Sequence, residues 1–195
     1  MKTIGWIAAA LLLAPSAAYA KEPAALSAVI ADPPPDAAYP AGMSAFVIPA
    51  QDGAMNAVMY TASGSGTHPT LLLLHGFPGN EQNLDLAQAA RRAGWNVLTL
   101  HYRGSWGSPG RFSFGNASED AFTALQFLQQ PATIAKFRID TSAIVVAGHS
   151  MGGFMAADAA AAEPRVAGLF LIDPWDPSQT AAALATPQGE AAWKA

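Results

Sequence analysis

Four short apolar runs constrain the fold of this chain more than any other feature. They cover residues 70–74, 95–100, 143–148 and 166–173. None alternates polar and apolar residues, so each is expected to be a strand buried on both faces. Segments with helical spacing of apolar residues follow the first three strands, at residues 80–94, 116–130 and 151–164. This order predicts an α/β fold, a mostly parallel sheet with helices on both faces.

The part of the chain before residue 70 has a different character. Residues 44–50 and 55–62 have the composition of two antiparallel strands joined around Asp52-Gly53, a dipeptide typical of tight turns. Residues 21–43 include three consecutive prolines at 33–35, which exclude a helix and a central strand there. We therefore expect an extended proline-rich arm over residues 21–43, followed by a domain over residues 44–195.

The first twenty residues have the pattern of a secretory signal peptide. Lys2 precedes an apolar run, and small residues stand around a cleavage point after Ala20. Pro15 and Ser16 break the run well short of the roughly 20 apolar residues that a membrane anchor needs. The sequence predicts a periplasmic or secreted protein with no stable membrane anchor after cleavage.

The charge and composition of the chain argue against several classes of function. Loss of Lys2 leaves 10 − 1 = 9 basic against 14 acidic residues, a net charge of −5, which argues against a nucleic-acid partner. The chain has no cysteine, so it has neither a disulfide framework nor a thiol nucleophile. It also carries no phosphate loop, dinucleotide fingerprint or histidine–carboxylate cluster of ligand spacing. We therefore predict no cofactor and no metal.

The stretch GHSMGG, residues 148–153, is the main candidate for catalysis. It joins a predicted strand to a predicted helix, which is the arrangement that lifts a serine clear on a sharp turn. Gly148 and Gly152 are expected because a side chain at either position would collide with the neighbouring strand or helix. The helix that begins at Met151 would point its free N–H groups toward Ser150. Ser150 is therefore predicted to be a nucleophile.

With these motifs the chain resembles the α/β-hydrolase superfamily, from about Ser44 to Asp173. The stretch LLLLHGFPGN, residues 71–80, is similar to the oxyanion loop of that family. The stretch that begins HYRGSWGSPGRF, at residue 101, resembles a loop of prolyl-oligopeptidase-like and serine-aminopeptidase-like members. The resemblance implies that the backbone N–H groups of Phe77 and Met151 are the oxyanion donors. It also implies a serine hydrolase that acts on a carboxylic ester or a small amide or peptide through an acyl-enzyme on Ser150.

The base of such a site is not found where the family has it. In this fold the histidine follows the serine in the chain, yet all four histidines precede Ser150. Asp173 is a candidate for the acid, with the alternative of a turn residue held by Pro174, and Asp176 is a weaker candidate.

Only 195 − 173 = 22 residues follow Asp173, whereas the family has further strands and helices there. We expect a partial α/β-hydrolase domain, C-terminally truncated, without the last strands and helices and inactive by itself. The alternative is a non-catalytic remnant that binds a ligand or partner through the same pocket. In a truncated domain the strand at 166–173 would lie unpaired at a sheet edge and promote aggregation.

For the histidines, Arg103 and five aromatic residues, we expect mainly structural roles. His75 is expected to hydrogen-bond backbone groups of its loop, with a substrate contact as the alternative, and His149 to have no catalytic role. His101 is interpreted as a packed, hydrogen-bonded residue and His68 as a solvated loop residue. Arg103 and Asp120 are predicted to pair, with a substrate-binding arginine as the alternative. Five aromatic residues are expected at the carboxyl ends of strands, in the pocket or in the core: Phe77, Trp106, Phe112, Phe114 and Trp175.

Overall fold

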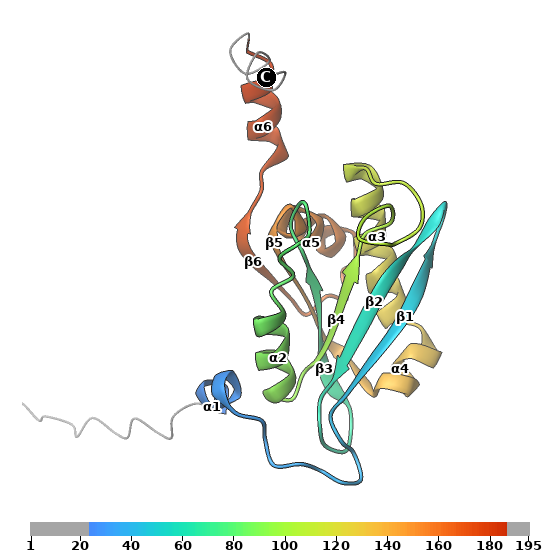
Figure 1. Cartoon of the computed structure of the whole chain (residues 1–195), viewed down its shortest axis with the longest axis vertical. Coiled ribbons are helices and arrows are strands. Elements are labelled where there is room, and N and C mark those ends of the chain that lie inside the picture. Colours follow the sequence, from blue (N-terminus) through green and yellow to red (C-terminus); the bar gives the residue numbers. More distant parts are fainter. Residues whose placement is uncertain (1–23, 187–195) are drawn as a thin grey trace, which may run out of the picture.

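A computed structural model describes residues 24–186 as one six-stranded sheet with helices packed against it (Figure 1). The strand order is β1-β2-β4-β3-β5-β6. The strands are β1 (Gly42–Ala50), β2 (Gly53–Thr61), β3 (His68–Leu74), β4 (Asn96–His101), β5 (Ile139–Ser150) and β6 (Gly168–Pro174). The helices are α1 (Ala24–Ile30), α2 (Leu84–Arg92), α3 (Phe114–Leu128), α4 (Pro131–Phe137), α5 (Met151–Ala162) and α6 (Pro177–Leu184).

The pairing of the strands confirms a mostly parallel sheet with an antiparallel start. Strands β1 and β2 form the predicted hairpin, with Ala50 opposite Gly53, and β2 pairs antiparallel with β4. Strands β4, β3, β5 and β6 are parallel to one another. Their carboxyl ends therefore meet at one edge of the sheet, where ligands bind in open α/β folds.

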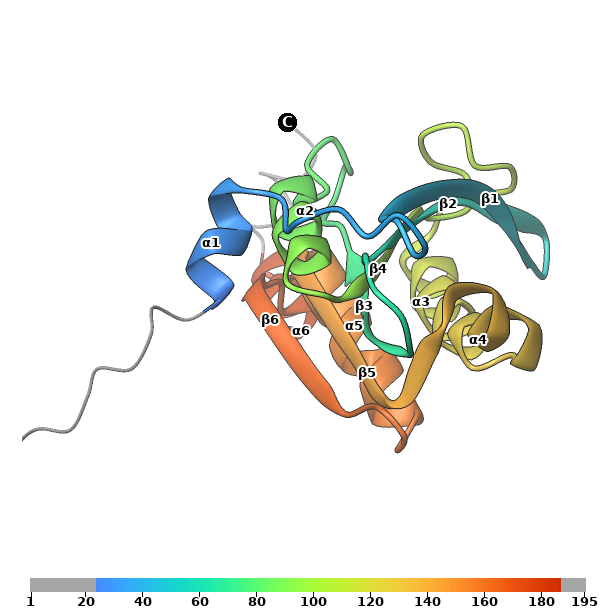
Figure 2. The ribbon, with the colours of Figure 1, turned by 90° about the horizontal axis from the view of Figure 1, so that it is seen from below.

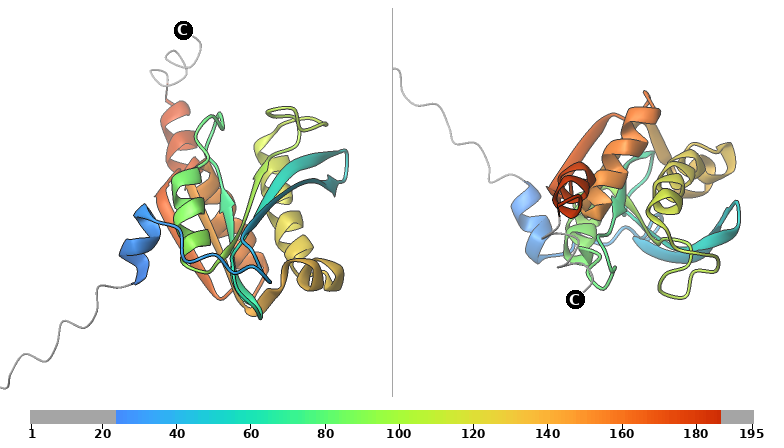
Figure 3. Two further views of the ribbon diagram at one scale, coloured as in Figure 1. Left: turned by 60° about the horizontal axis from the view of Figure 1, so that its bottom comes forward. Right: turned by 90° about the horizontal axis from the view of Figure 1, so that it is seen from above.

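Helices cover both faces of the sheet, as the non-alternating apolar runs predict. In β3, Leu72 belongs to the core cluster that contains Leu125 of α3 and Met155 of α5. Its neighbour Leu73 belongs to the opposite cluster, which contains Ala87 of α2. The view from above in Figure 3 shows α3 and α5 on one side of the strands and α2 on the other. Successive side chains of a strand point to opposite faces, which is why this strand has no polar face.

The prediction of an extended arm is wrong for its first described part. Residues Ala24–Ile30 form helix α1, which lies beside α2 in Figures 1 and 2. Arg92 of α2 donates to the carbonyl of Val29 at 3.3 Å, and Arg91 pairs with Asp32 at 2.6 Å. These contacts satisfy and anchor the end of a short helix that its own residues would stabilise only weakly. The prolines at 33–35 stay outside helices and strands, as expected.

Other boundaries differ in smaller ways. Strand β1 begins at Gly42, two residues before the expected start of the domain. Helix α2 begins only at Leu84, and the short helix α4, with Pro131 at its start, was not predicted. The predicted signal peptide lies outside the described residues. Within residues 24–186, no helix is both long and apolar enough to cross a membrane.

Strand β6 forms one edge of the sheet, as predicted. It pairs with β5 on one side, and within the described residues no strand pairs with its other side. Leu169, Phe170 and Leu171 are 43%, 56% and 39% exposed, so apolar side chains are accessible on both faces. An open strand edge of this composition can template pairing with another chain, and aggregation stays a prediction.

Candidate active site

Ser150 lies where β5 ends and α5 begins, at the carboxyl edge of the parallel strands. Its backbone has φ 53° and ψ −120°, a conformation that residues with a side chain rarely adopt. Such a conformation costs on the order of 1–3 kcal/mol and persists only where the surroundings impose it. Ser150 therefore has the strained turn that a nucleophile elbow requires.

Two glycines make this tight turn sterically accessible. A Cβ atom on Gly148 would lie 2.0 Å from the carbonyl oxygen of Gly152, and one on Gly152 would lie 2.2 Å from that of Leu74. Both distances are far inside van der Waals contact, and the atoms met are backbone rather than flexible side chain. The collisions expected from the sequence at these two positions are confirmed.

The loop after β3 approaches the serine from the other side. A Cβ on Gly76 would lie 3.0 Å from the Ser150 Cβ, so the backbone of this loop runs against the serine. The N–H of the next residue, Phe77, has no hydrogen-bond acceptor within residues 24–186. Met151 is the first residue of α5, whose leading N–H groups lack partners inside the helix. The geometry thus offers backbone donors from two segments beside one hydroxyl.

An apolar pocket of about 550 Å³ opens at Ser150. Phe77 and Phe114 form part of its wall, and Trp175 packs on Phe114 with ring centroids 5.1 Å apart. The Trp175 backbone N–H donates to the Ser150 carbonyl at 2.9 Å, which ties this wall to the elbow. The lining residues are Phe77, Phe114, Ser150, Met151, Trp175, Pro177, Thr180 and Ala181.

The five aromatic residues singled out in the sequence separate into three groups. Phe77, Phe114 and Trp175 line the pocket at Ser150. Phe112 packs beside Phe77, with centroids 5.6 Å apart, and supports this wall. Trp106 lines a different cleft, on the far part of the oxyanion loop.

The pocket also uses residues that the sequence did not single out. Pro177, Thr180 and Ala181 belong to α6, and the Trp175 indole N–H donates to the Thr180 hydroxyl at 2.6 Å. Asp176 accepts from the backbone N–H of Ser178 at 2.8 Å, which is the arrangement of a helix N-cap. An aspartate followed by proline was a readable signal for the start of this helix.

Two of the histidines lie under the oxyanion loop. His75 is buried, and its Nδ1 faces the carbonyl of Gly76 at 2.7 Å, so the predicted backbone contact is confirmed. Burial lowers the pKa of His75, and the nearby His101 ring lowers it further. His101 is hydrogen-bonded to Gln82, as expected for a packed residue, and burial lowers its pKa as well. Both imidazoles are therefore favoured in the neutral form.

The remaining histidines do not complete a triad. His68 is buried at the start of β3, and its two ring nitrogens face the carbonyls of Gly94 and Gly64 at 3.0 and 3.2 Å, so the prediction of a solvated loop residue is wrong. A β-strand that begins two residues earlier than expected explains the error. Within residues 24–186, the hydroxyl of Ser150 receives no hydrogen bond from His149 or any other histidine.

Arg103 and Asp120 form the predicted ion pair. The guanidinium Nε lies 2.6 Å from Asp120 Oδ1, both side chains are buried, and the backbone N–H of Arg103 donates to the same carboxylate at 2.8 Å. Glu119 adds a second, exposed carboxylate at 2.9 Å. Burial raises the pKa of Asp120, and the Arg103 donors oppose that rise. The pair joins the glycine-rich loop to α3, and Arg103 is not in the pocket at Ser150.

The candidate acids occupy the end of β6. Asp173 has φ 42°, and the following Pro174 ends the strand. A Cβ on Gly153 would lie 2.8 Å from the Pro174 Cβ, so this turn packs closely against α5. Asp176 serves as the N-cap of α6. In the described residues neither carboxylate has a histidine partner.

The fold and this elbow define a class of protein, and comparison with known sequences agrees. Residues 71–195, more than half of the chain, match the profile of the Alpha/beta hydrolase family. The chain belongs to this family.

Individual relatives support the same assignment. Over 118 residues the chain is 32% identical to acylamino-acid-releasing enzyme 1 of Oryza sativa subsp. japonica, covering 53% of this chain and 14% of that protein. A thermophilic carboxylesterase cloned from a metagenomic library is 26% identical, with a TM-score of 0.55 over 77% of this chain and 51% of that one. An esterase of Pyrobaculum calidifontis has the same fold, with a TM-score of 0.59 and 22% identity over 85% of this chain and 54% of that one.

The chain is short compared with these relatives. It spans 14% of the rice protein and about half of the two esterase chains. The family match over residues 71–195 includes most of β3, all of β4, β5 and β6, and the turn at Ser150.

Proposed function

We propose that the protein is a serine hydrolase that cleaves a carboxylic ester or a small amide through an acyl-enzyme on Ser150. The observation that carries the proposal is the strained Ser150 backbone, with φ 53°, placed beside an apolar pocket and two sets of backbone donors. Strained backbone conformations of this kind cluster at active sites. Esterases and an acylamino-acid-releasing enzyme among the relatives favour acyl transfer as the reaction class.

This chain supplies the nucleophile and the oxyanion donors of the proposed reaction. The Ser150 hydroxyl oxygen attacks the carbonyl carbon of the substrate, and its proton passes to a base. The negative charge that develops on the carbonyl oxygen is held by the N–H groups of Phe77 and Met151. The C–O or C–N bond to the leaving group then breaks, the leaving group takes the proton, and water later hydrolyses the ester formed on Ser150.

We propose that a histidine outside these 195 residues is the base, because the fold takes its triad histidine from a position after the serine. Asp173 is the candidate acid on this chain, since it ends a strand at the same edge of the sheet as Ser150. Without a base, a triad enzyme typically loses several powers of ten in rate, although the oxyanion hole retains some catalysis. The 195-residue chain is therefore expected to acylate slowly.

A fluorophosphonate probe tests the proposal, because its phosphorus bonds to the serine oxygen as fluoride leaves. We expect labelling of the chain that disappears in Ser150→Ala and persists in Ser142→Ala, a matched serine near the opposite end of β5. Added imidazole, as an external base, is expected to accelerate the Ser150-dependent part. Labelling that is absent, or that is equal in Ser150→Ala, contradicts the proposal.

A second candidate function is ligand binding without catalysis. The observation that favours it is the pocket itself, in whose described lining no charged side chain occurs. Binding of a phenyl ester analogue that Trp175→Ala abolishes, together with no labelling of Ser150, would favour this second function.

We also propose that the protein acts outside the cytoplasm, on the basis of the leader pattern in residues 1–20. Expression in a bacterial host, followed by fractionation and N-terminal sequencing, tests this. Mature protein that begins at Lys21 in the periplasm supports export, and retention of Met1 in the cytoplasm contradicts it.

A further inference from the structure

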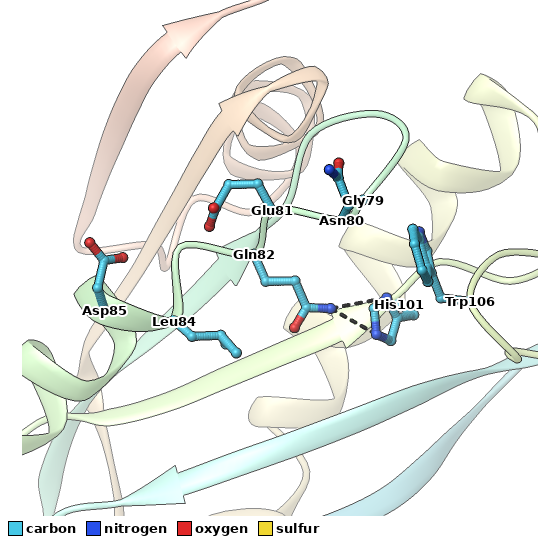
Figure 4. Close-up of a pocket in the computed structure, with 8 residues that line it drawn as sticks. All are labelled: Gly79, Asn80, Glu81, Gln82, Leu84, Asp85, His101 and Trp106. Atoms are coloured by element: carbon cyan, nitrogen blue, oxygen red, sulfur yellow. Dashed lines mark hydrogen bonds between the residues drawn. The ribbon is translucent and has the colours of Figure 1, made fainter.

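A second cleft, of about 640 Å³, lies beside the oxyanion loop, and among residues 24–186 it shares no lining residue with the pocket at Ser150. Residues 79–82 form one wall, and His101 and Trp106 come from the end of β4 and the loop after it. The start of α2 completes the cleft with Leu84 and Asp85 (Figure 4). The proposed hydrolase reaction uses none of these side chains.

Trp106 is held as a fixed, accessible surface of this cleft. It is 54% exposed, and its backbone has φ 48°, which is rare and costly for a bulky residue. The indole N–H donates to the carbonyl of Pro78 at 2.5 Å, and the ring stacks on His101 with centroids 6.1 Å apart. An exposed indole fixed at its polar edge offers a rigid apolar face to a ligand.

The charged side chains that line the cleft are both acidic. Glu81 and Asp85 contribute two carboxylates, and no lysine or arginine is among the lining residues. Among the described residues neither carboxylate forms an ion pair, although Asp85 also suits the first turn of a helix. His101 adds no positive charge, since burial lowers its pKa. The cleft therefore favours a cation over an anion.

The arrangement of these groups sets the shape of the ligand. In Figure 4 the two carboxylates lie toward one side of the cleft and Trp106 toward the other, with the Gln82 amide hydrogen-bonded to His101 between them. A compact cation would engage only one of these ends. An elongated molecule can place an apolar body on the indole and a cationic head near the carboxylates.

One polar atom beneath the cleft has no partner. His75 is 3% exposed, and its Nε2 has no hydrogen-bond partner within residues 24–186. Its ring lies against His101, with centroids 5.4 Å apart, and a Cβ on Gly79 would be 2.6 Å from its Cε1. Both of these neighbours line the cleft. Since Nδ1 faces a carbonyl and so carries the proton, Nε2 is an unused acceptor on a ring that lies against the residues of the cleft.

From these observations we infer that the cleft between the oxyanion loop, α2 and Trp106 binds an organic cation of the alkylguanidinium or alkylammonium type that carries an apolar body. Guanidinium suits the site because it donates to carboxylates through a planar fork. The cation could belong to the substrate, as a basic side chain, or to a separate small molecule. The site goes beyond the hydrolase function and does not depend on it.

Calorimetric titration with Nα-benzoyl-arginine amide tests the inference at an ionic strength of about 0.01 M, where surface charges are weakly screened. Nα-benzoyl-citrulline amide is the matched probe, because it has nearly the same shape without the charge. We expect saturable binding of the arginine compound and binding at least about fivefold weaker for the citrulline compound. Equal affinities, or no saturable binding of the arginine compound, overturn the inference.

Variants of the protein locate the binding. The double variant Glu81→Gln/Asp85→Asn is expected to weaken binding of the arginine compound about five- to tenfold, since each exposed pair contributes a modest Coulomb attraction. Trp106→Ala is expected to weaken the binding of both compounds, because both carry the benzoyl group. Asp52→Asn, an exposed aspartate in the β1–β2 turn, is the control for a loss of charge. Unchanged affinity in the double variant contradicts the inference even where wild-type binding is seen.

The source of the cation is distinguished by labelling. If it is part of the substrate, a fluorophosphonate with a guanidinium tail labels Ser150 faster than one with a neutral tail, and the double variant removes the difference. If it is a separate molecule, the two tails give equal rates while benzoyl-arginine amide still binds. Because calorimetry requires no reaction at Ser150, failure of the hydrolase proposal and failure of the cation site are observed separately.

Discussion

The strained backbone of Ser150 leads to a prediction in which glycine stabilises the protein at the cost of function. Ser150 has φ 53°, a value that glycine adopts without penalty. Relief of strain in Ser150→Gly is worth about 1–3 kcal/mol. Ser150→Ala loses the same hydroxyl but keeps the Cβ atom and therefore the strain. Both variants should be equally inert toward fluorophosphonate.

The comparison between these two variants isolates the strain. At an unstrained site, a variant with glycine is less stable toward unfolding than the same protein with alanine by roughly 0.4–1 kcal/mol. Subtracting this cost leaves Ser150→Gly more stable than Ser150→Ala by about 1 kcal/mol, or about 2–4 °C in Tm for a domain of this size.

Urea denaturation followed by circular dichroism measures the difference. Ser142, on the same strand and without a positive φ, gives the control pair Ser142→Gly and Ser142→Ala, for which alanine should be the more stable. If Ser150→Gly is also less stable than Ser150→Ala, the Ser150 backbone is not strained and the elbow argument fails.

The remaining predictions concern Gly152, the Arg103–Asp120 ion pair, the Glu163–Arg165 pair and the unpaired edge of β6. Gly152→Ala places a Cβ 2.2 Å from a backbone oxygen and should cost about 3 kcal/mol or more, whereas Gly168→Ala, which meets only Val145 at 3.5 Å, should be nearly neutral by the same urea assay. Asp120→Asn breaks the buried pair with Arg103 and should cost about 3–5 kcal/mol, while Glu119→Gln, at the exposed partner, should cost at most about 1 kcal/mol; equal losses would refute the role of burial. Hydrogen bonding to Arg165 lowers the pKa of Glu163 from 4.5 to about 2, so this carboxylate stabilises the fold above pH 4.5 and the gain fades as pH falls toward 2. Glu163→Gln should accordingly be less stable than the wild type at pH 6, with the gap closing at lower pH, and a gap independent of pH would contradict this. Phe170→Lys on β6 should reduce association in size-exclusion chromatography, and an unchanged elution profile would count against edge pairing.

The sequence was sufficient to predict the structure where the steric requirements involve residues close together in the chain. The strand, the serine and the two glycines of the elbow stand within a few residues, and a turn of that tightness needs glycine at both places whatever surrounds it. The apolar run in β3 likewise predicts burial on both faces, because Leu72 and Leu73 point in opposite directions. The Arg103–Asp120 pair was also predictable, since the loop and helix that carry the two residues are adjacent in the chain.

The errors arise where distant contacts decide the structure. Helix α1 is held by Arg91 and Arg92, which lie about sixty residues away in the chain, and a prediction based on nearby prolines does not include them. The ring nitrogens of His68 face the carbonyl oxygens of Gly94 and Gly64, and these contacts allow the ring to be buried. The composition of the sequence does not reveal them. Trp106 was grouped with the pocket aromatics, but it lines another cleft, where its indole N–H donates to the carbonyl of Pro78. Local preference is a weak guide when tertiary contacts compete with it.

The attachment of α6 has a consequence for how the size of the pocket at Ser150 could change. Figure 1 shows α6 beyond the end of the sheet, following β6. One wall of the pocket thus comes from a segment that reaches the elbow through the Trp175 backbone and the rings of Phe114 and Phe154. Insertions or substitutions between Trp175 and Ala181 can widen, narrow or reshape that wall without disturbing a single strand pairing. Under the proposed function, the nucleophile and the wall that would select its acyl group are therefore separable, and libraries that diversify residues 175–181 alone should change acyl preference while the elbow stays intact.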